Sequence, residues 1–450
     1  MGSRILAVGL VALLAFGIAS NGPANGDSEK DCFPASSLCL KSLRGSMQGQ
    51  SGIALELDGD GMEDLVVGAP YAKRRGGRGA LLVYSGRPNG FRERPSAVWE
   101  GEGNLGWQLA SLGDVDDDGR ADFAAAAFSG GNEEVSLAGT VAVYLGGAGS
   151  QAAVVLAGEN ALDKFGYSLT SGDLNGDGAA DLMVGAPYHS PSPALYQKGA
   201  VYAYFGPDYD PATAVKIAAS AAYGGIGFSL AAGDINGDGI DDLLMEATGK
   251  VIGYYGAQGT FAPSPAGPDV VFTSTAAGFG RAIAVLWDVD ADGFRDVAVG
   301  AHQATVAEVM DSGSLFILKG GSGSRTVDAD AVSADRLARI DGEPAFGRFA
   351  SAILPLPDID GDAVPDLAVS AVHADGARWP VTGKICLFSG ADLTSGPSVA
   401  AARAIPGKAR DMHLGAFLAH VRGGEWLAAG APTEDGNTGS VRLYRLHGRP

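Results

Sequence analysis

Short apolar runs recur along the whole chain, separated by stretches rich in glycine and aspartate. Residues 81–84, 141–144 and 315–318 are three such runs, and each combines Val, Leu or Ile with an aromatic residue. Runs of four to six residues with this composition, bounded by glycine or proline, predict buried β-strands. Long stretches with a helical period of 3.6 residues are almost lacking, so the pattern predicts an all-β fold.

An acidic loop lies between two of these runs, and its most complete copy falls within residues 165–188. Oxygen-bearing side chains occupy positions 1, 3, 5 and 9 of the loop, with glycine at position 6: Asp173, Asn175, Asp177, Asp181 and Gly178. Several hard oxygens at this spacing suit Ca²⁺, and glycine allows the sharp turn. An EF-hand needs Glu at position 12 and flanking helices, but Val184 stands there. We therefore predict a calcium loop between two strands, closed by a bidentate Asp181.

This loop recurs six times, and its position-nine aspartates are 54 to 70 residues apart. The predicted calcium ligands are Glu56, Asp58, Asp60 and Asp64; Asp114, Asp116, Asp118 and Asp122; Asp173, Asn175, Asp177 and Asp181; Asp234, Asn236, Asp238 and Asp242; Asp288, Asp290, Asp292 and Asp296; Asp358, Asp360, Asp362 and Asp366. A regular period of this length indicates a repeat array.

Two loops depart from the pattern. The first has the longer Glu56 at position 1, and the sixth has Ala363 where glycine belongs, with Pro365 just before its closing aspartate. An alanine held at positive φ costs about 1 kcal/mol, so we expect the sixth loop to be the one that distorts or stays empty. The chain is therefore predicted to bind five or six Ca²⁺. In a seventh unit the loop shrinks to residues 422–425, and no metal is expected there.

Each unit also has a third apolar run that ends in glycine and a fourth run before the next unit. Four short strands in each of seven units predict a seven-bladed β-propeller. The last unit stops after three strands, whereas residues 38–43 form an unpaired run before the first unit. We predict that this N-terminal strand completes the last blade, which closes the ring and leaves no long edge exposed.

The N-terminus has the pattern of a secretory signal peptide in residues 1–20, with one basic residue and then an apolar run. A membrane anchor is the alternative, but the run is shorter than the roughly 20 residues of a span. We expect a flexible lead at 21–37, a propeller at 38–450 and a secreted, extracellular or periplasmic protein without a membrane span after cleavage. An oxidising compartment would allow Cys32 and Cys39 to pair, and Cys386 is expected to be a buried thiol.

The formal net charge is −20, and 22 of the 52 acidic residues belong to the six loops. This balance argues against nucleic acid or anionic membranes as partners. It also concentrates the negative charge where a cation is predicted, because carboxylates held within a few ångströms of one another oppose folding unless a cation lies between them.

Residues 165–166 (FG), the loop at 173–181 and residues 185–187 (GAP) together resemble the FG-GAP repeats of integrin α-chain N-terminal propellers and of bacterial FG-GAP proteins. The resemblance covers about residues 38–449. It implies calcium between the first and second strands of each blade, all on one face, with partner contacts on the opposite face. We expect the ions to be mainly structural. No leg domains follow the propeller, so a stand-alone module is expected and pairing with an integrin β-chain is not.

Two groups of residues should lie on the partner face. One is the basic segment Lys73, Arg74, Arg75 and Arg78, a candidate contact for an acidic partner; the other is the set His302, His373 and His413, where zinc or a catalytic cluster is conceivable. The chain has no GxSxG, HExxH, P-loop or CxxC motif, so an enzyme is not expected.

The sequence thus predicts a secreted calcium-binding propeller that acts as a protein-binding or cell-adhesion-like module, with an extracellular or envelope protein or glycan as its partner. Two alternatives stay open. One is a metal-dependent hydrolase or lyase acting on a glycan or lipid. The other is a structural envelope or matrix protein.

Overall fold

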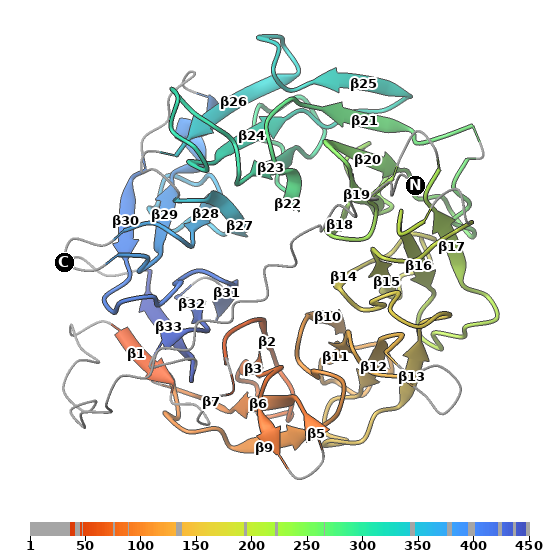
Figure 1. The fold of residues 1–450 in the computed structure, drawn as a ribbon, viewed down its shortest axis with the longest axis vertical. Coiled ribbons are helices and arrows are strands. Elements are labelled where there is room, and N and C mark those ends of the chain that lie inside the picture. The colour runs from red at the N-terminus through yellow and green to blue at the C-terminus, as the bar shows by residue number, and fades with distance from the viewer. Residues whose placement is uncertain are drawn as a thin grey trace, which may run out of the picture.

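The computed structural model describes residues 37–40, 46, 48–74, 77–88, 90–131, 137–192, 196–220, 224–264, 266–342, 347–375, 380–394, 401–421, 425–434 and 438–446. Across these ranges, seven blade sheets surround a central axis (Figure 1). The predicted seven-bladed β-propeller is therefore confirmed. The predicted signal peptide at 1–20, Cys32 and nearly all of the predicted lead at 21–37 lie outside the described residues.

In each blade the chain runs from the innermost strand outward through antiparallel neighbours. The blades are β2 (Gly52–Leu55), β3 (Asp64–Gly68), β6 (Ala80–Tyr84) and β9 (Ala97–Glu100); β10 (Leu109–Gly113), β11 (Asp122–Ala127), β12 (Thr140–Tyr144) and β13 (Val154–Ala157); β14 (Ser168–Gly172), β15 (Asp181–Ala186), β16 (Ala200–Tyr204) and β17 (Val215–Ala218); β18 (Leu230–Gly233), β19 (Asp242–Ala247), β20 (Lys250–Tyr254) and β21 (Val270–Thr273); β22 (Phe279–Val285), β23 (Val297–Ala301), β24 (Ser314–Leu318) and β26 (Arg336–Asp341); β27 (Phe349–Leu356), β28 (Asp366–Ala371), β29 (Lys384–Phe388) and β30 (Arg403–Pro406); β31 (Leu418–Val421), β32 (Trp426–Ala431), β33 (Ser440–Arg445) and β1 (Ser37–Leu40).

The ring closes through the seventh blade, where strands from both ends of the propeller meet. β1 pairs antiparallel with β33, in a register that sets Ser37 opposite Tyr444 and Leu40 opposite Val441. Leu40 is fully buried in a cluster that also contains residues of the first blade. The predicted closure by an N-terminal strand is therefore observed, and it pairs an edge of β33 that would otherwise be open.

The core lies between blades. The second strand of a blade faces a neighbour on each side, and every residue of β3, β11 and β15 is buried. Phe123 of the second blade, for example, stacks on Trp99 of the first with ring centroids 5.8 Å apart. Burial on both faces explains why these strands read as continuous apolar runs instead of alternating ones.

The FG and GAP glycines meet where neighbouring blades approach each other most closely. A Cβ built on Gly68, which ends β3, would lie 1.9 Å from the carbonyl oxygen of Gly106 in the second blade. Gly185 and Gly227 repeat this contact between the third and fourth blades, at 2.3 Å. Only glycine allows backbones to come this close, so the GAP glycine of one blade and the FG glycine of the next form a single contact between the two blades.

One strand was not predicted. β25 (Arg325–Asp328) lies between β24 and β26 in the chain but pairs in parallel with β21 on the outer edge of the fourth blade (Figure 1). The chain thus leaves the fifth blade, adds a fifth strand to the fourth, and returns. The described residues contain short hairpins β4–β5 (Lys73–Arg74, Gly77–Arg78) and β7–β8 (Gly86–Arg87, Gly90–Phe91) and the 3-10 turn η2 (Gly390–Thr394), and no helix long and apolar enough to span a membrane.

Candidate metal-binding loops and the opposite face

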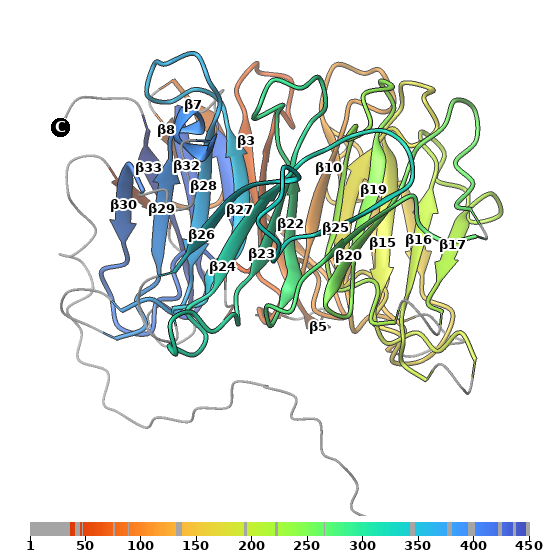
Figure 2. The ribbon, with the colours of Figure 1, turned by 90° about the horizontal axis from the view of Figure 1, so that it is seen from above.

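The six acidic loops join the first and second strands of blades one to six, and so emerge together at one end of the strands (Figure 2). Several are tied to the following blade through the carbonyl group at position 2. The carbonyl oxygen of Leu174 accepts a hydrogen bond from the backbone N–H of Ala257 at 3.1 Å, and that of Ile235 accepts one from Gly321 at 2.7 Å. The loop backbones are therefore part of the contacts between blades.

The aspartate at position 9 is the buried anchor of each loop. All six are at most 1% exposed. In the third loop, Asp181 accepts one hydrogen bond from the backbone N–H of Leu174 at 2.8 Å and another from Gly206, after the third strand, at 3.1 Å. Asp242 repeats this pair of bonds in the fourth loop. Position 9 therefore links three segments of one blade, in addition to the closing role that we predicted.

Burial raises the pKa of every position-nine aspartate, and this effect exceeds the opposing effect of the backbone hydrogen bonds. The pKa is about 6 for Asp64, Asp181 and Asp296, and about 7 for Asp242. It is also raised for Asp122 and Asp366. Neighbouring carboxylates in each loop add to the increase, so an ionised position 9 is costly unless a cation is close.

Position 1 orders the turn that follows it. Asp173 accepts hydrogen bonds from the backbone N–H groups of Asp177 and Gly178, at 3.1 and 2.9 Å. The position-six glycines have φ between 77° and 96°, and Ala363 takes their place with φ 70°. The N–H of Ala363 still donates to Asp358 at 2.8 Å. The distortion expected of the sixth loop is therefore not seen. Ala363 instead adopts the left-handed backbone conformation of the glycines, which is strained for an alanine.

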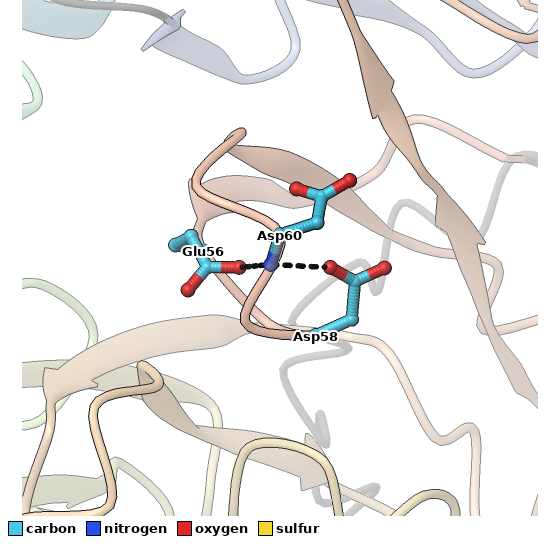
Figure 3. A group of neighbouring side chains, drawn as sticks. All are labelled: Glu56, Asp58 and Asp60. Carbon is cyan, nitrogen blue, oxygen red and sulfur yellow. Dashed lines mark hydrogen bonds between the residues drawn. The ribbon is translucent and has the colours of Figure 1, made fainter.

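Acidic oxygens gather closely in four of the loops. Within each group the ligand atoms lie within 4.8 Å of one another, and the groups are Glu56, Asp58 and Asp60; Asp114, Asp116 and Asp122; Asp288, Asp290 and Asp296; Asp358, Asp360 and Asp366. In the first loop Glu56 accepts the N–H of Asp60 at 3.1 Å, so its longer side chain still reaches the turn (Figure 3). Loops three and four have an asparagine at position 3. These donor sets consist of hard oxygens and fit Ca²⁺.

The fifth loop contains a cation of its own. The ammonium group of Lys319, just after β24, forms ion pairs with Asp290 and, at 3.2 Å, with Asp292. Sequence reasoning missed this residue, because it stands 23 to 31 residues from the ligands in the chain and only folding places it beside them. Its position directly after a third strand was the available signal.

The opposite face has a cavity of about 420 Å³ on the propeller axis. Three consecutive residues from each blade line it, and the first residues of these seven sets are Gln50, Trp107, Tyr167, Phe228, Arg281, Ser351 and Ala416. Three of them form an aromatic arc, with centroid distances of 5.5 Å between Trp107 and Tyr167 and 5.4 Å between Tyr167 and Phe228.

The predicted contact residues of this face are only partly described. Lys73 and Arg78 are exposed and stand opposite each other in the β4–β5 hairpin. Arg75 and the side chain of Arg74 lie outside the described residues. The rings of His373 and His413 meet with centroids 4.9 Å apart. Within the described ranges, however, every group of three or more residues with metal-ligand atoms within 4.8 Å of one another is acidic, so the geometry does not support a zinc cluster with His302.

Comparison with known proteins is consistent with this architecture. The FG-GAP repeat family model matches residues 165–204, 226–260 and 279–318, and the FG-GAP-like repeat model matches residues 57–125. Integrin alpha-5 of Xenopus laevis is 29% identical over 251 residues, which cover 52% of this chain and 22% of that protein. Integrin alpha-7 of Mus musculus is 37% identical over 169 residues, 34% of this chain and 14% of that protein. Each match thus spans less than a quarter of the relative.

Proposed function

From the premise that this chain is an FG-GAP repeat β-propeller of the integrin α N-terminal type, we propose that it is a secreted, calcium-stabilised module. It binds an extracellular or envelope protein or glycan, in an adhesion-like role, through the face opposite its acidic loops. The calcium ligands are the residues at positions 1, 3, 5 and 9 of loops one to six. The ions are structural.

The observation that carries this proposal is the crowding of carboxylates in the loops. Three acidic groups with ligand atoms within 4.8 Å of one another repel strongly, and the repulsion is largest where position 9 is buried. Among the described residues, the basic side chains that form ion pairs inside the loops are Arg120 with Asp118 and Lys319 in the fifth loop. The remaining loops depend on an external cation.

The number of bound ions follows from the individual loops. The sixth loop keeps the hydrogen bonds of the others, which supports a sixth site. Lys319 competes for the carboxylates of the fifth loop, which weakens that site. Extracellular calcium modules have Kd values of about 10⁻⁴–10⁻³ M, in keeping with a secreted protein.

The two ends of the propeller present different surfaces to a partner. The loop end is occupied by the acidic turns and their links between blades. The other end has the axial cavity, the aromatic arc and the exposed Lys73 and Arg78. Aromatic rings beside polar and cationic groups are typical of protein-binding surfaces.

Thermal unfolding of the mature chain, from about residue 21, with calcium and with excess chelator tests the structural part of the proposal. Calcium at ten times Kd should stabilise the fold by about 1.4 kcal/mol per occupied site, so several sites should raise the midpoint by many degrees. Asp116→Ala, at an exposed ligand position outside the buried anchor, should reduce the calorimetric ion count by one. Equal midpoints with calcium and chelator would refute calcium stabilisation.

The partner face is tested separately, with calcium present. Replacement of Lys73 and Arg78 by Ser should weaken retention of a partner from the native envelope fraction. Arg295→Ser, an exposed arginine at the loop end, is the matched control and should leave retention unchanged. Equal loss in both variants would point to net charge instead of a specific face.

A further inference from the structure

Arg348 immediately precedes β27 at the end of the propeller opposite the acidic loops, and part of its guanidinium group has no partner in the described structure. One terminal nitrogen lies 3.7 Å from the carboxylate of Asp311, but the buried Nε has no hydrogen-bond partner. Its backbone is left-handed, with φ 51°, and the Ser351 hydroxyl donates to its carbonyl oxygen at 2.6 Å. A buried donor without an acceptor and a strained backbone both cost free energy.

Three histidines from three different blades lie within electrostatic range of this arginine. His302 follows β23, His373 follows β28, and His413 precedes β31. The charge of Arg348 lowers the pKa of all three, so all three lie within electrostatic range of it. The Nδ1 atom of His302 is also buried without a partner, whereas that of His413 contacts the Thr433 hydroxyl at 2.5 Å.

Burial is the largest cause of these lowered pKa values, which are about 4 for both His302 and His373. These two imidazoles are therefore neutral at pH 7, and each offers one N–H donor. An anion placed beside them would favour the charged imidazolium and raise the pKa again. Binding would then be coupled to proton uptake.

The other charged groups nearby leave room for an anion. Arg281 lies within electrostatic range of His302, and the carboxylate of Glu246 forms an ion pair with Arg281 at 3.2 Å. Burial raises the pKa of Glu246 to about 7, which reduces its charge near neutrality. The Asp311 carboxylate lies 3.7 Å from one terminal nitrogen of Arg348 and also acts to raise the pKa of His302. Asp411 acts in the same way on the pKa of His413. The Nε side of Arg348 and the unpaired nitrogen of His302 therefore face no described carboxylate within hydrogen-bonding distance.

Arg348 can be reached from solvent, because its side chain is 24% exposed. Ser351, whose hydroxyl donates to the Arg348 carbonyl oxygen, lines the axial cavity. The sixth blade contributes the small side chain of Ser351 at the position where the second to fourth blades contribute aromatic rings. Arg281 contributes to the same lining. Its guanidinium group lies over the Phe228 ring, 4.4 Å from the ring centroid, so this cation continues the aromatic arc.

We propose that Arg348, His302 and His373 form a binding site for an oxyanion, that is, for a carboxylate or sulfate-like group of the partner. Arginine provides planar N–H donors that match such groups, and the neutral imidazoles add two further donors. The inference rests on the proposed use of this face for binding, but it requires no particular loop to hold calcium.

Titration of the mature chain with sodium sulfate and with sodium acetate, at pH 5.5, 6.5 and 7.5 in 1 mM calcium, tests the site. Calorimetry measures the affinity for each anion. The NMR resonances of the six histidine imidazoles, assigned with His→Gln variants, show where the anion binds. We expect the resonances of His302 and His373 to shift and the affinity to increase severalfold from pH 7.5 to 5.5. Tighter sulfate binding would indicate a sulfated or phosphorylated partner, and tighter acetate binding a carboxylated one.

Arg348→Gln should weaken binding by at least about tenfold, as expected for loss of charge-assisted hydrogen bonds. Arg92→Gln, at an exposed arginine between β8 and β9, should leave affinity unchanged, and both variants should keep the calcium-dependent thermal midpoint. Undiminished binding by Arg348→Gln, or unshifted resonances with both anions, would overturn the proposal. A missing calcium effect in the unmodified chain would instead refute calcium stabilisation and leave the anion titration interpretable.

Discussion

Replacement of Ala363 by glycine should stabilise the propeller. Ala363 occupies position 6 of the sixth loop with φ 70°, where the other five loops have glycine. A left-handed backbone costs an alanine about 1–2 kcal/mol. At each of the five glycines a built Cβ meets no atom within 4 Å. The exposed methyl group of Ala363 therefore has no evident packing to offset the strain.

The expected gain is smaller than the strain itself. Glycine also gives the unfolded chain more conformational freedom, which costs about 0.4–1 kcal/mol. The difference leaves about 0.5–1 kcal/mol in favour of Ala363→Gly. The reciprocal change, Gly178→Ala in the third loop, should destabilise by a similar amount because its surroundings are equally open.

Urea unfolding measures these differences, in chelator and again in saturating calcium, so that backbone strain and ion binding are separated. Ala363→Ser, which keeps a Cβ, is the matched control and should behave as the unmodified chain. The reasoning fails if Ala363→Gly is no more stable than the parent, or if Gly178→Ala loses nothing.

Three further predictions follow from other sites. Lys319→Met should increase the calcium affinity of the fifth loop, because the ammonium group no longer pairs with Asp290; calorimetry showing unchanged affinity would contradict this. Burial raises the pKa of Glu246 to about 7 in spite of its ion pair with Arg281, so its neutral form is favoured in the folded protein and stability is lost as pH rises through 7. The stability of Glu246→Gln relative to the parent should therefore grow from pH 5 to 8. A difference in urea unfolding that stays constant over this range would count against the prediction. Gly68→Ala would place its Cβ 1.9 Å from a carbonyl oxygen of the second blade and should cost about 3 kcal/mol or more, so wild-type stability in urea would show that the blades move apart freely.

Most strands and all six loops could be predicted because their signals are local. A third strand such as β16 is an uninterrupted apolar run closed by glycine, and the ligand spacing within one loop spans only nine residues. The two-residue turn between β19 and β20 was also predictable, from the short interval between their runs. Neither inference requires knowledge of which blades touch.

Other features were invisible because their partners are distant in sequence. The parallel pairing of β25 with β21 joins segments 55 residues apart, and no local pattern distinguishes it from an ordinary fourth strand. The anchoring bonds of the position-nine aspartates depend on glycines 14 to 25 residues further along the chain. The ion pairs of Lys319 likewise form only when the blade has folded.

The sequence by itself determined the repeat, the number of blades and the chemistry of the loops, since strand pattern, turn glycine and oxygen donors all act over a few residues. Only the tertiary structure decided which charges meet. Arg348 and the three histidines come from blades five to seven, and the lowered pKa values of the histidines arise first from burial and then from the charge of Arg348. Electrostatic coupling depends on distance in space, and closure of the ring sets that distance.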